Sequence, residues 1–439
     1  MADTAVQAIT HRRVLSISIP IVVANATVPL LGLVDTGVVG QMGEAAPIGA
    51  VGIGAIILSA IYWLFGFLRM GTTGLTSQAI GAGQNREESA LLSRALLIGG
   101  LIGLTVIALQ KPIFWAGFQL APASDEVEAL ARDYLVVRVW GAPALIALYG
   151  INGWLIAKEC TGSVLLLQLV MNGINILLDL WFVLGLGWGV QGVALATLIA
   201  EWGGLCLGLW LCVSGFKSGA WRDRSLVFDQ VRLRLMLVIN RDILFRSLFI
   251  EIIFVSFLFA GARFGDVTLA ANQILLQFLH VTSYMLDGFA QAAETLVGKA
   301  VGRSDKSRLR RGALLASLWG GVMTLALCLF FALLGGPLID LMAKAPEVQA
   351  DARAFLIYAA IAPALGLAPY MLDGVFIGAT RTRDMRNMMA LSLLVYVVFA
   401  LLLVPSFANH GLWMALMISF LARTITMALR YPALERDLF

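Results

Sequence analysis

Charge is what this sequence has least of. Only 13% of its 439 residues are Asp, Glu, Lys or Arg, whereas 60% are hydrophobic. A soluble globular domain carries about 25% charged residues. Because the apolar residues form long runs and not short alternating segments, the composition excludes both a soluble domain and a membrane barrel. It predicts an all-α, polytopic membrane protein.

Motifs for catalysis and metal binding are missing as well. The sequence has no Walker A glycine loop, which argues against direct coupling to ATP, and no Ser/His/Asp arrangement or HExxH motif. The four cysteines lie within or beside apolar runs, without the spacing of metal ligands (Cys160, Cys206, Cys212 and Cys328). We expect a protein that is not an enzyme, holds no cofactor and binds no nucleic acid. We also expect a monomer, because no interface motif is evident.

Twelve stretches are apolar enough to cross a bilayer. A membrane-spanning helix needs about 20 apolar residues. The even number places both termini on the same side of the membrane. The stretches cover residues 14–39, 47–71, 91–110, 134–157, 164–185, 190–213, 242–262, 267–290, 312–334, 355–379, 388–407 and 411–430.

The basic residues predict the orientation. They gather near both termini, at one end of the stretches and in the segment 214–241, whereas the opposite loops hold few. Loops rich in Lys and Arg stay in the cytosol. We therefore predict a multi-pass protein of the bacterial inner membrane with both termini and residues 214–241 in the cytosol. Arg246, at the start of the seventh stretch, is assigned to this cytosolic set.

The chain repeats itself at a shift of 221 or 222 residues. Four matches occur in the same order in both halves: Gly43–Phe67 with Gly265–Phe289, Gln78–Gly81 with Lys299–Gly302, Tyr149–Ala157 with Tyr370–Gly378, and Gly189 with Gly411. They predict two pseudo-symmetric six-helix lobes, residues 1–213 and 242–439, joined by the linker 214–241. Parallel repeats of this kind are a transporter architecture.

Several polar residues of the first lobe lie at similar depth below the outer face. At 1.5 Å rise per residue, Asp35 lies about 7 Å deep, Asp179 about 9 Å and Thr197 about 12 Å. Asn175 shares the helix face of Asp179, and Glu201 that of Thr197, since each pair is four residues apart. The sequence therefore predicts that these side chains meet in one outward cavity.

Such a cluster suits proton or cation coupling. Two neighbouring carboxylates in an apolar medium cannot both stay charged at low cost, so one of them should hold a proton at physiological pH. The same oxygens suit a hard cation such as sodium. A polar cluster that only fixes helix packing is a third interpretation. The residues by themselves leave all three open.

The second lobe has acids of its own. Glu251 lies about 15 Å into the seventh stretch, and Asp287 and Asp373 lie in the eighth and tenth stretches. Ionisable residues within a membrane segment indicate a functional site. We predict a second cation or substrate site from these three acids, with sodium as an ion for Glu251 and Asp373.

The motifs resemble those of the multidrug and toxic compound extrusion (MATE) family. The resemblance rests on LVDTGVVGQMG in the first stretch, NILLD in the fifth and GVQGVALAT after it. The two YMLDG segments, at Tyr284–Gly302 and Tyr370–Asn387, are similar to the DinF branch in particular. The resemblance covers nearly the whole chain. It implies two six-helix bundles that alternate access and exchange amphipathic, often cationic drugs for protons or sodium.

The resemblance also assigns roles to residues. The proton-coupling or cation-coupling set of the family falls on Asp35, Asn175, Asp179 and Thr197. Sodium-coupled relatives use second-lobe acids at places that Glu251 and Asp373 match. In some relatives a tyrosine lies four residues before the first aspartate, where this chain has Leu31.

We therefore predict a secondary active multidrug efflux antiporter that exports amphipathic or cationic organic compounds in exchange for H+ or Na+. The alternative is a flippase for lipid-linked precursors, which has a similar helical layout. A flippase would need a wide basic central cavity to hold pyrophosphate. The basic residues are expected in cytosolic loops and at helix ends, which disfavours that alternative.

Overall fold

The computed structural model describes residues 8–42, 44–121 and 123–438, and these are almost entirely helical, without a β-strand. Contacts divide the chain into two compact units. The N-terminal unit is Val23–Leu237, and the C-terminal unit combines the chain up to Val22 with the chain from Val238 onward. Helix α1 (His11–Gly40) contributes to both units.

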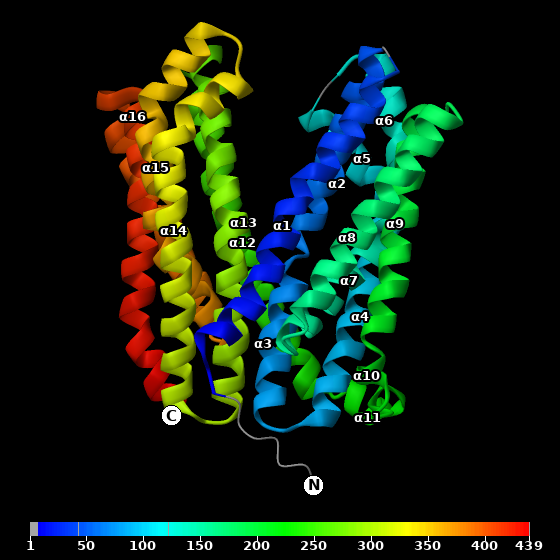
Figure 1. Cartoon of the computed structure of the whole chain (residues 1–439), viewed down its shortest axis with the longest axis vertical. Helices are drawn as coiled ribbons and strands as arrows, with labels where there is room; N and C mark the ends of the chain where they lie inside the picture. Colours follow the sequence, from blue (N-terminus) through cyan, green and yellow to red (C-terminus); the bar gives the residue numbers. More distant parts are fainter. Residues whose placement is uncertain (1–7, 43, 122, 439) are drawn as a thin grey trace. The chain divides into compact units, whose positions relative to one another are not determined.

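The N-terminal unit is built from α1 and eight further main helices (Figure 1). Helices α2 and α3 follow each other as one span, and so do α6 and α7. A π-helical segment, Leu180–Gly185, continues α8. The helices are α2 (Ala45–Leu64), α3 (Phe67–Gly81), α4 (Asn85–Ala108), α5 (Gln110–Leu120), α6 (Asp125–Arg138), α7 (Ala142–Ala157), α8 (Thr161–Asp179) and α9 (Gly189–Leu211).

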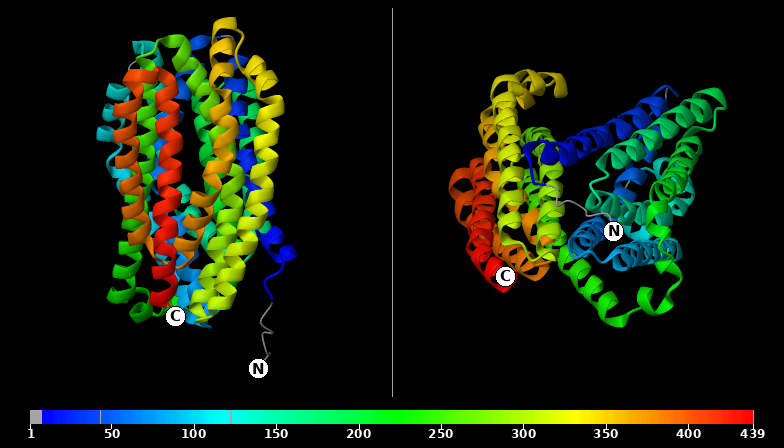
Figure 2. Two further views of the ribbon diagram at one scale, coloured as in Figure 1. Left: turned by 90° about the vertical axis from the view of Figure 1, so that its left-hand side faces the viewer. Right: turned by 60° about the horizontal axis from the view of Figure 1, so that its bottom comes forward.

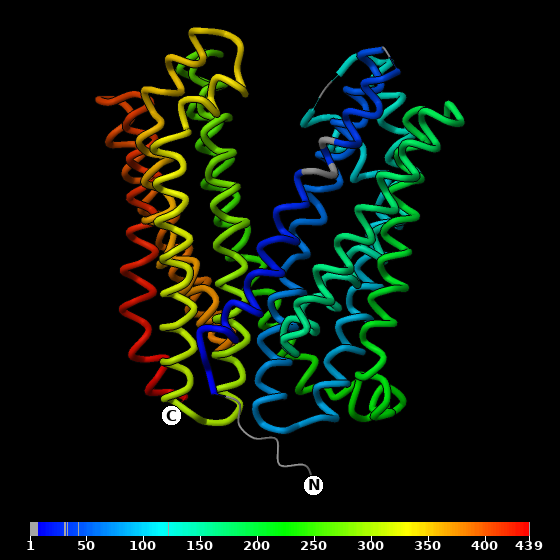
Figure 3. Tube along the Cα trace, in the orientation of Figure 1, coloured from blue at the N-terminus to red at the C-terminus, as the bar shows by residue number. Residues whose placement is uncertain are grey.

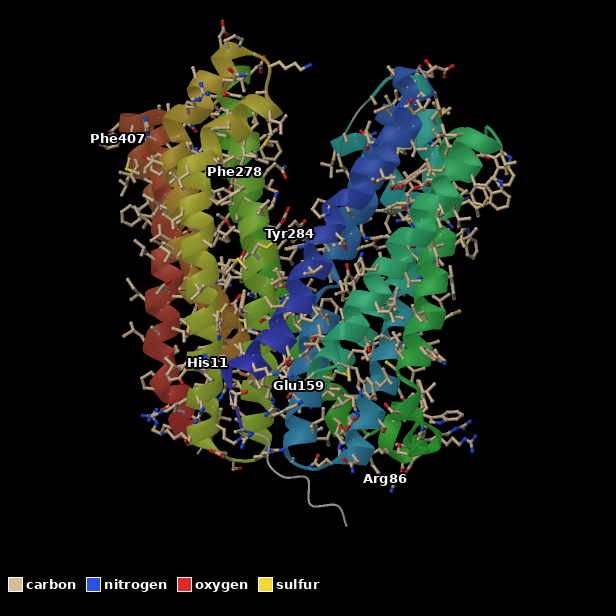
Figure 4. The ribbon with its side chains drawn as sticks, in the orientation of Figure 1. His11, Arg86, Glu159, Phe278, Tyr284 and Phe407 are labelled. Atoms are coloured by element: carbon tan, nitrogen blue, oxygen red, sulfur yellow. The ribbon has the colours of Figure 1, made fainter. Side chains whose placement is uncertain are left out.

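The C-terminal unit consists of long helices that run side by side in both views of Figure 2: α12 (Gln230–Ala262), α13 (Asp266–Gly302), α14 (Lys306–Met342), α15 (Pro346–Gly378) and α16 (Thr382–Leu438). The backbone of α16 leaves the helical conformation at Ala408, where φ is 48°. The trace in Figure 3 turns back there, so α16 is two antiparallel helices. Figure 4 places Phe407 at one end of this unit, while His11 lies towards the other end, where the C-terminus is also found.

Twelve membrane spans account for these helices. Ten helices of the described chain are long and apolar enough to cross a membrane. This count takes α16 once, although it holds two helices, and it omits the 37-residue α13, whose hydropathy is lowered by polar residues. Each unit therefore contains six spans, which confirms the fold class predicted from the sequence.

The backbone itself repeats at the predicted shift. Residues with positive φ are uncommon unless they are glycine. Here they recur in pairs 221 residues apart: Gly83 with Ser304, Glu159 with Thr380, and Gly187 with Ala408. The same turns therefore join corresponding helices in both units, even where the second unit has a residue other than glycine.

Helix packing repeats in the same way. A Cβ atom on Gly153 of α7 would lie 2.4 Å from the carbonyl oxygen of Arg69 on α3. In the C-terminal unit, a Cβ atom on Gly374 of α15 would lie 2.3 Å from the carbonyl oxygen of Ala290 on α13. Both members of each contact are 221 residues apart between the units. Glycine is needed at both places because two helix backbones touch there.

Alanine at Gly374 should therefore destabilise the protein. The added methyl group meets a backbone oxygen that cannot move aside, and overpacking of this kind costs about 1–3 kcal/mol. Gly153→Ala should behave alike. Thermal unfolding of the purified protein in detergent measures both. The matched control is Gly100→Ala, since nothing lies within 4 Å of a Cβ there. Equal melting temperatures for Gly374→Ala and Gly100→Ala would contradict the expected contact.

The predicted linker 214–241 is shorter and more ordered than expected. Short helices, including Arg224–Val227, pack beside α4, and α12 already begins at Gln230. Buried Arg94 of α4 donates hydrogen bonds to the carbonyl oxygens of Leu226 at 2.6 Å and Val227 at 3.0 Å. The Ser225 hydroxyl donates to Asp223, which helps to hold the pKa of that carboxyl below its usual value. This segment is therefore part of the N-terminal unit.

Candidate functional site

Asp35 and Asp179 form the centre of the N-terminal unit's polar site. Asp179 is fully buried at the end of α8, and Asp35 is half-buried on α1. The two carboxyl groups lie close enough that each is affected by the charge of the other. No donor of the described chain bonds to either carboxyl oxygen of Asp179. Two ionised carboxylates only accept hydrogen bonds, so a proton on one of them would supply the missing donor.

The local backbone positions this pair. The chain changes from α-helix to a π-helical turn directly after Asp179, and such turns are frequent at functional sites. Asn172, two turns earlier on α8, donates a hydrogen bond from Nδ2 to the Thr27 carbonyl oxygen of α1 at 3.3 Å. This bond ties α8 to the helix that carries Asp35. The two aspartates are thus held on adjoining helices.

Asn175 and Thr197 meet directly. The Asn175 Nδ2 atom donates to Thr197 Oγ1 at 3.0 Å, and this hydroxyl donates to the Val193 carbonyl oxygen at 3.0 Å. Both side chains are buried. The Asn175 Oδ1 atom has no hydrogen-bond partner among the described residues. Since Asn175 lies one turn before Asp179, a neutral oxygen is added on the face of α8 that carries the aspartate.

A buried arginine completes the cluster, and the sequence analysis overlooked it. Arg138, the last residue of α6, forms an ion pair with Glu201 of α9, at 2.8 Å between Nη1 and Oε2. Both side chains are buried. Arg138 also acts electrostatically on Asp35 and Asp179. The signal was available, because Arg138 is a single basic residue inside the apolar stretch 134–157.

Gly141 makes the ion pair fit. A Cβ atom on this residue would lie 1.8 Å from the Glu201 Oε2 atom. A glycine in the short 3-10 turn Val139–Gly141 therefore leaves the space in which the Glu201 carboxylate reaches Arg138. The N-terminal unit thus holds three acidic side chains against one arginine, which favours a bound proton or cation.

The second-lobe acids are arranged differently. The Asp373 Oδ2 atom accepts hydrogen bonds from both Arg246 of α12 and Arg423 of α16. Glu251 is exposed on α12, and Asp287 accepts a hydrogen bond from Gln291 at 2.5 Å. Within the described ranges, no group of three His, Cys, Asp or Glu residues has a geometry that would hold a metal ion. The structure does not bring Glu251, Asp287 and Asp373 together.

The expectation that basic residues lie in loops and at helix ends is wrong for several arginines. Arg246 was assigned to the cytosolic end of a span, but it is buried in the C-terminal unit together with Arg423. Arg138 is likewise buried in the N-terminal unit. The physical reason is that each has a carboxylate partner, which no pattern along the chain reveals.

Comparisons with known proteins agree with this architecture. The MatE family model matches residues 20–181 and 243–402. DNA damage-inducible protein F of Escherichia coli is 37% identical over 421 residues, covering 94% of this chain and 90% of that protein. The probable multidrug resistance protein NorM of Xanthomonas campestris is 27% identical over 465 residues, covering 96% and 94%.

Solved structures share the fold. A MATE protein in the bent conformation has a TM-score of 0.86 at 22% identity, with 97% of this chain and 96% of that chain covered. An outward-facing multidrug resistance transporter of the MATE family has a TM-score of 0.83 at 20% identity, with 97% of both chains covered. None of these matches supports the flippase alternative. The chain belongs to the MatE family of multidrug efflux transporters.

Proposed function

We propose that this protein exports small amphipathic, cationic compounds in exchange for protons, and that Asp35 and Asp179 form the proton-binding pair. The observation that carries the proposal is the buried Asp179 carboxylate, which lacks a donor and adjoins a second carboxyl group. A charged group in this position needs a proton or a cation beside it. The relatives named multidrug resistance proteins support the substrate class.

Charge in the N-terminal cluster explains the exchange. With both aspartates ionised, Asp35, Asp179 and Glu201 outweigh Arg138, and the net negative charge attracts a cationic substrate. A proton on the aspartate pair removes one negative charge and weakens that attraction. Proton and substrate therefore compete for the same charge, which is the requirement for antiport.

Asn175 and Thr197 have a supporting role in this proposal. Their mutual hydrogen bond fixes the Asn175 amide, so that its free Oδ1 atom adds a neutral acceptor one turn from Asp179. An amide oxygen stays an acceptor whether or not the aspartates are protonated. It therefore helps to hold a cationic group without changing the charge that the proton must neutralise.

The direction of transport follows from the orientation. We propose that both termini face the cytosol in the bacterial inner membrane, as the distribution of basic residues predicts. A proton that moves inward then gains about 2.3 kcal/mol per 100 mV of membrane potential. This energy, together with an inward pH gradient, drives export of the organic cation.

Efflux from proteoliposomes tests the function. A fluorescent cationic dye is loaded, and a pH gradient and a sodium gradient are imposed in turn. We expect efflux under the pH gradient without sodium, because two adjoining carboxyl groups suit a proton. Efflux that requires sodium and ignores pH would contradict proton coupling and assign the oxygens of the cluster to Na+. Dye movement equal to that of protein-free liposomes under both gradients would contradict export itself.

A further inference from the structure

A separate polar cavity lies inside the C-terminal unit. Its wall is apolar over most of its area, formed by Ile250, Phe254 and Leu279 among others, and it is partly open. Two arginines, Arg246 and Arg423, line it together with the hydroxyl groups of Ser283 and Tyr370. The cavity has a volume of about 70 Å³. A drug-sized pocket measures about 300–1,000 Å³, so this cavity holds a head group and not a whole drug.

The charges around the cavity do not balance. Arg246 and Arg423 bring two positive charges, and the acid bonded to them, Asp373, brings one negative charge. All three side chains are at least nine-tenths buried. An unbalanced charge in a buried position costs several kcal/mol, so the triad calls for a second anion. This polarity is the reverse of that in the N-terminal cluster.

Unused donors point to the same conclusion. A guanidinium group has five N–H donors. Both arginines bond to a single oxygen of Asp373, Oδ2, and the buried Arg246 Nε atom has no hydrogen-bond partner in the described chain. Arg246 lines the cavity, so its group presents free donors to an occupant. Arginine forks of this kind match the two oxygens of a carboxylate.

We propose that this cavity binds the carboxylate head of a small amphipathic anion. Arg246 and Arg423 bind the two carboxylate oxygens, and the apolar wall contacts the adjoining part of the hydrocarbon body. The Ser283 and Tyr370 hydroxyls, which are hydrogen-bonded to each other, lie beside the head group. The protein therefore has a second binding site with the opposite charge preference from the one proposed for cation export.

Equilibrium binding to the full chain in nanodiscs, without any gradient, tests the site. The probes share one fluorophore and differ in charge: dansylglycine carries a carboxylate and dansylcadaverine an ammonium group. We expect saturable binding of dansylglycine that benzoate displaces and chloride at equal concentration does not. Absence of saturable binding would overturn the proposal. Displacement by chloride as strong as by benzoate would also overturn it, because a bare ion would then be the ligand.

A series of charge variants separates binding from folding. Arg423→Gln should weaken dansylglycine binding about tenfold, the size expected for one charged hydrogen bond. Asp373→Asn removes the competing carboxylate and should tighten binding. The double variant Asp373→Asn/Arg423→Gln restores the wild-type charge balance and should bind within about threefold of wild type. A structural role would not produce this order.

The outcome is independent of the efflux experiment. Equal affinity of wild type and the Asp373→Asn variant for dansylglycine would overturn the proposal, and that variant leaves both arginines in place if Arg423→Gln fails to fold. Gln349→Ala serves as the control, since Gln349 bonds to the Ala343 carbonyl oxygen at the far end of α14 and does not line the cavity.

Discussion

Proton-driven dye efflux should be lost when Asp35 is replaced by asparagine. Asparagine has nearly the same shape but cannot bind or release a proton at physiological pH. Asp35→Asn therefore leaves the site unable to alternate between two charge states. We expect the rate of efflux under a pH gradient to fall at least about tenfold, which corresponds to a loss of 1.4 kcal/mol or more of coupling free energy.

The same variant should fold as well as the wild type. Asp35 adjoins Asp179, and a neutral amide removes the repulsion between two carboxylates while supplying an N–H donor to the unbonded Asp179 oxygens. The melting temperature in detergent is expected to stay equal or to rise. Loss of efflux together with loss of folding would leave the coupling role unsupported, and wild-type efflux would contradict it.

Asp125→Asn is the matched control. This acid lies exposed in the first turn of α6, in the same unit, and its replacement also removes one negative charge. Export should continue at the wild-type rate because Asp125 lies outside the buried cluster. Asp179→Asn should resemble Asp35→Asn, since either substitution breaks the pair.

Breaking the ion pair between Arg138 and Glu201 should have the largest effect on stability. Removal of one partner of a buried ion pair leaves an uncompensated charge, which costs about 3–5 kcal/mol. Arg138→Met and Glu201→Gln should each lower the free energy of unfolding by about this amount. Arg138→Met should have the further effect of weakening export, because Arg138 also acts on the aspartate pair.

The double variant gives the decisive measurement. Arg138→Met/Glu201→Gln leaves no unpaired charge at this position, so its stability should exceed that of either single variant. A double-mutant cycle in chemical denaturant measures the coupling between the two residues. Additive losses would contradict a direct pair and would mean that each side chain is stabilised by other groups.

The sequence by itself determined the architecture. Long apolar stretches have one low-cost conformation in a bilayer, the helix, so the twelve spans follow from composition. The repeat followed from four matches at one shift, and the structure confirms it through recurring turns such as Glu159 and Thr380. Counting depth along helices also grouped Asn175 with Thr197, which the structure shows to be hydrogen-bonded.

The tertiary structure decided which charges meet. Arg138 and Glu201 are 63 residues apart, and Arg246 and Asp373 are 127 apart. No helical periodicity relates such distant positions. The sequence therefore placed Arg246 at the cytosolic end of a span and grouped Asp373 with Glu251, while the packing of α12, α15 and α16 surrounds Asp373 with two arginines. Burial makes an unpaired charge costly, so the partner of each charge is chosen by packing in three dimensions, which a pattern along the chain does not contain.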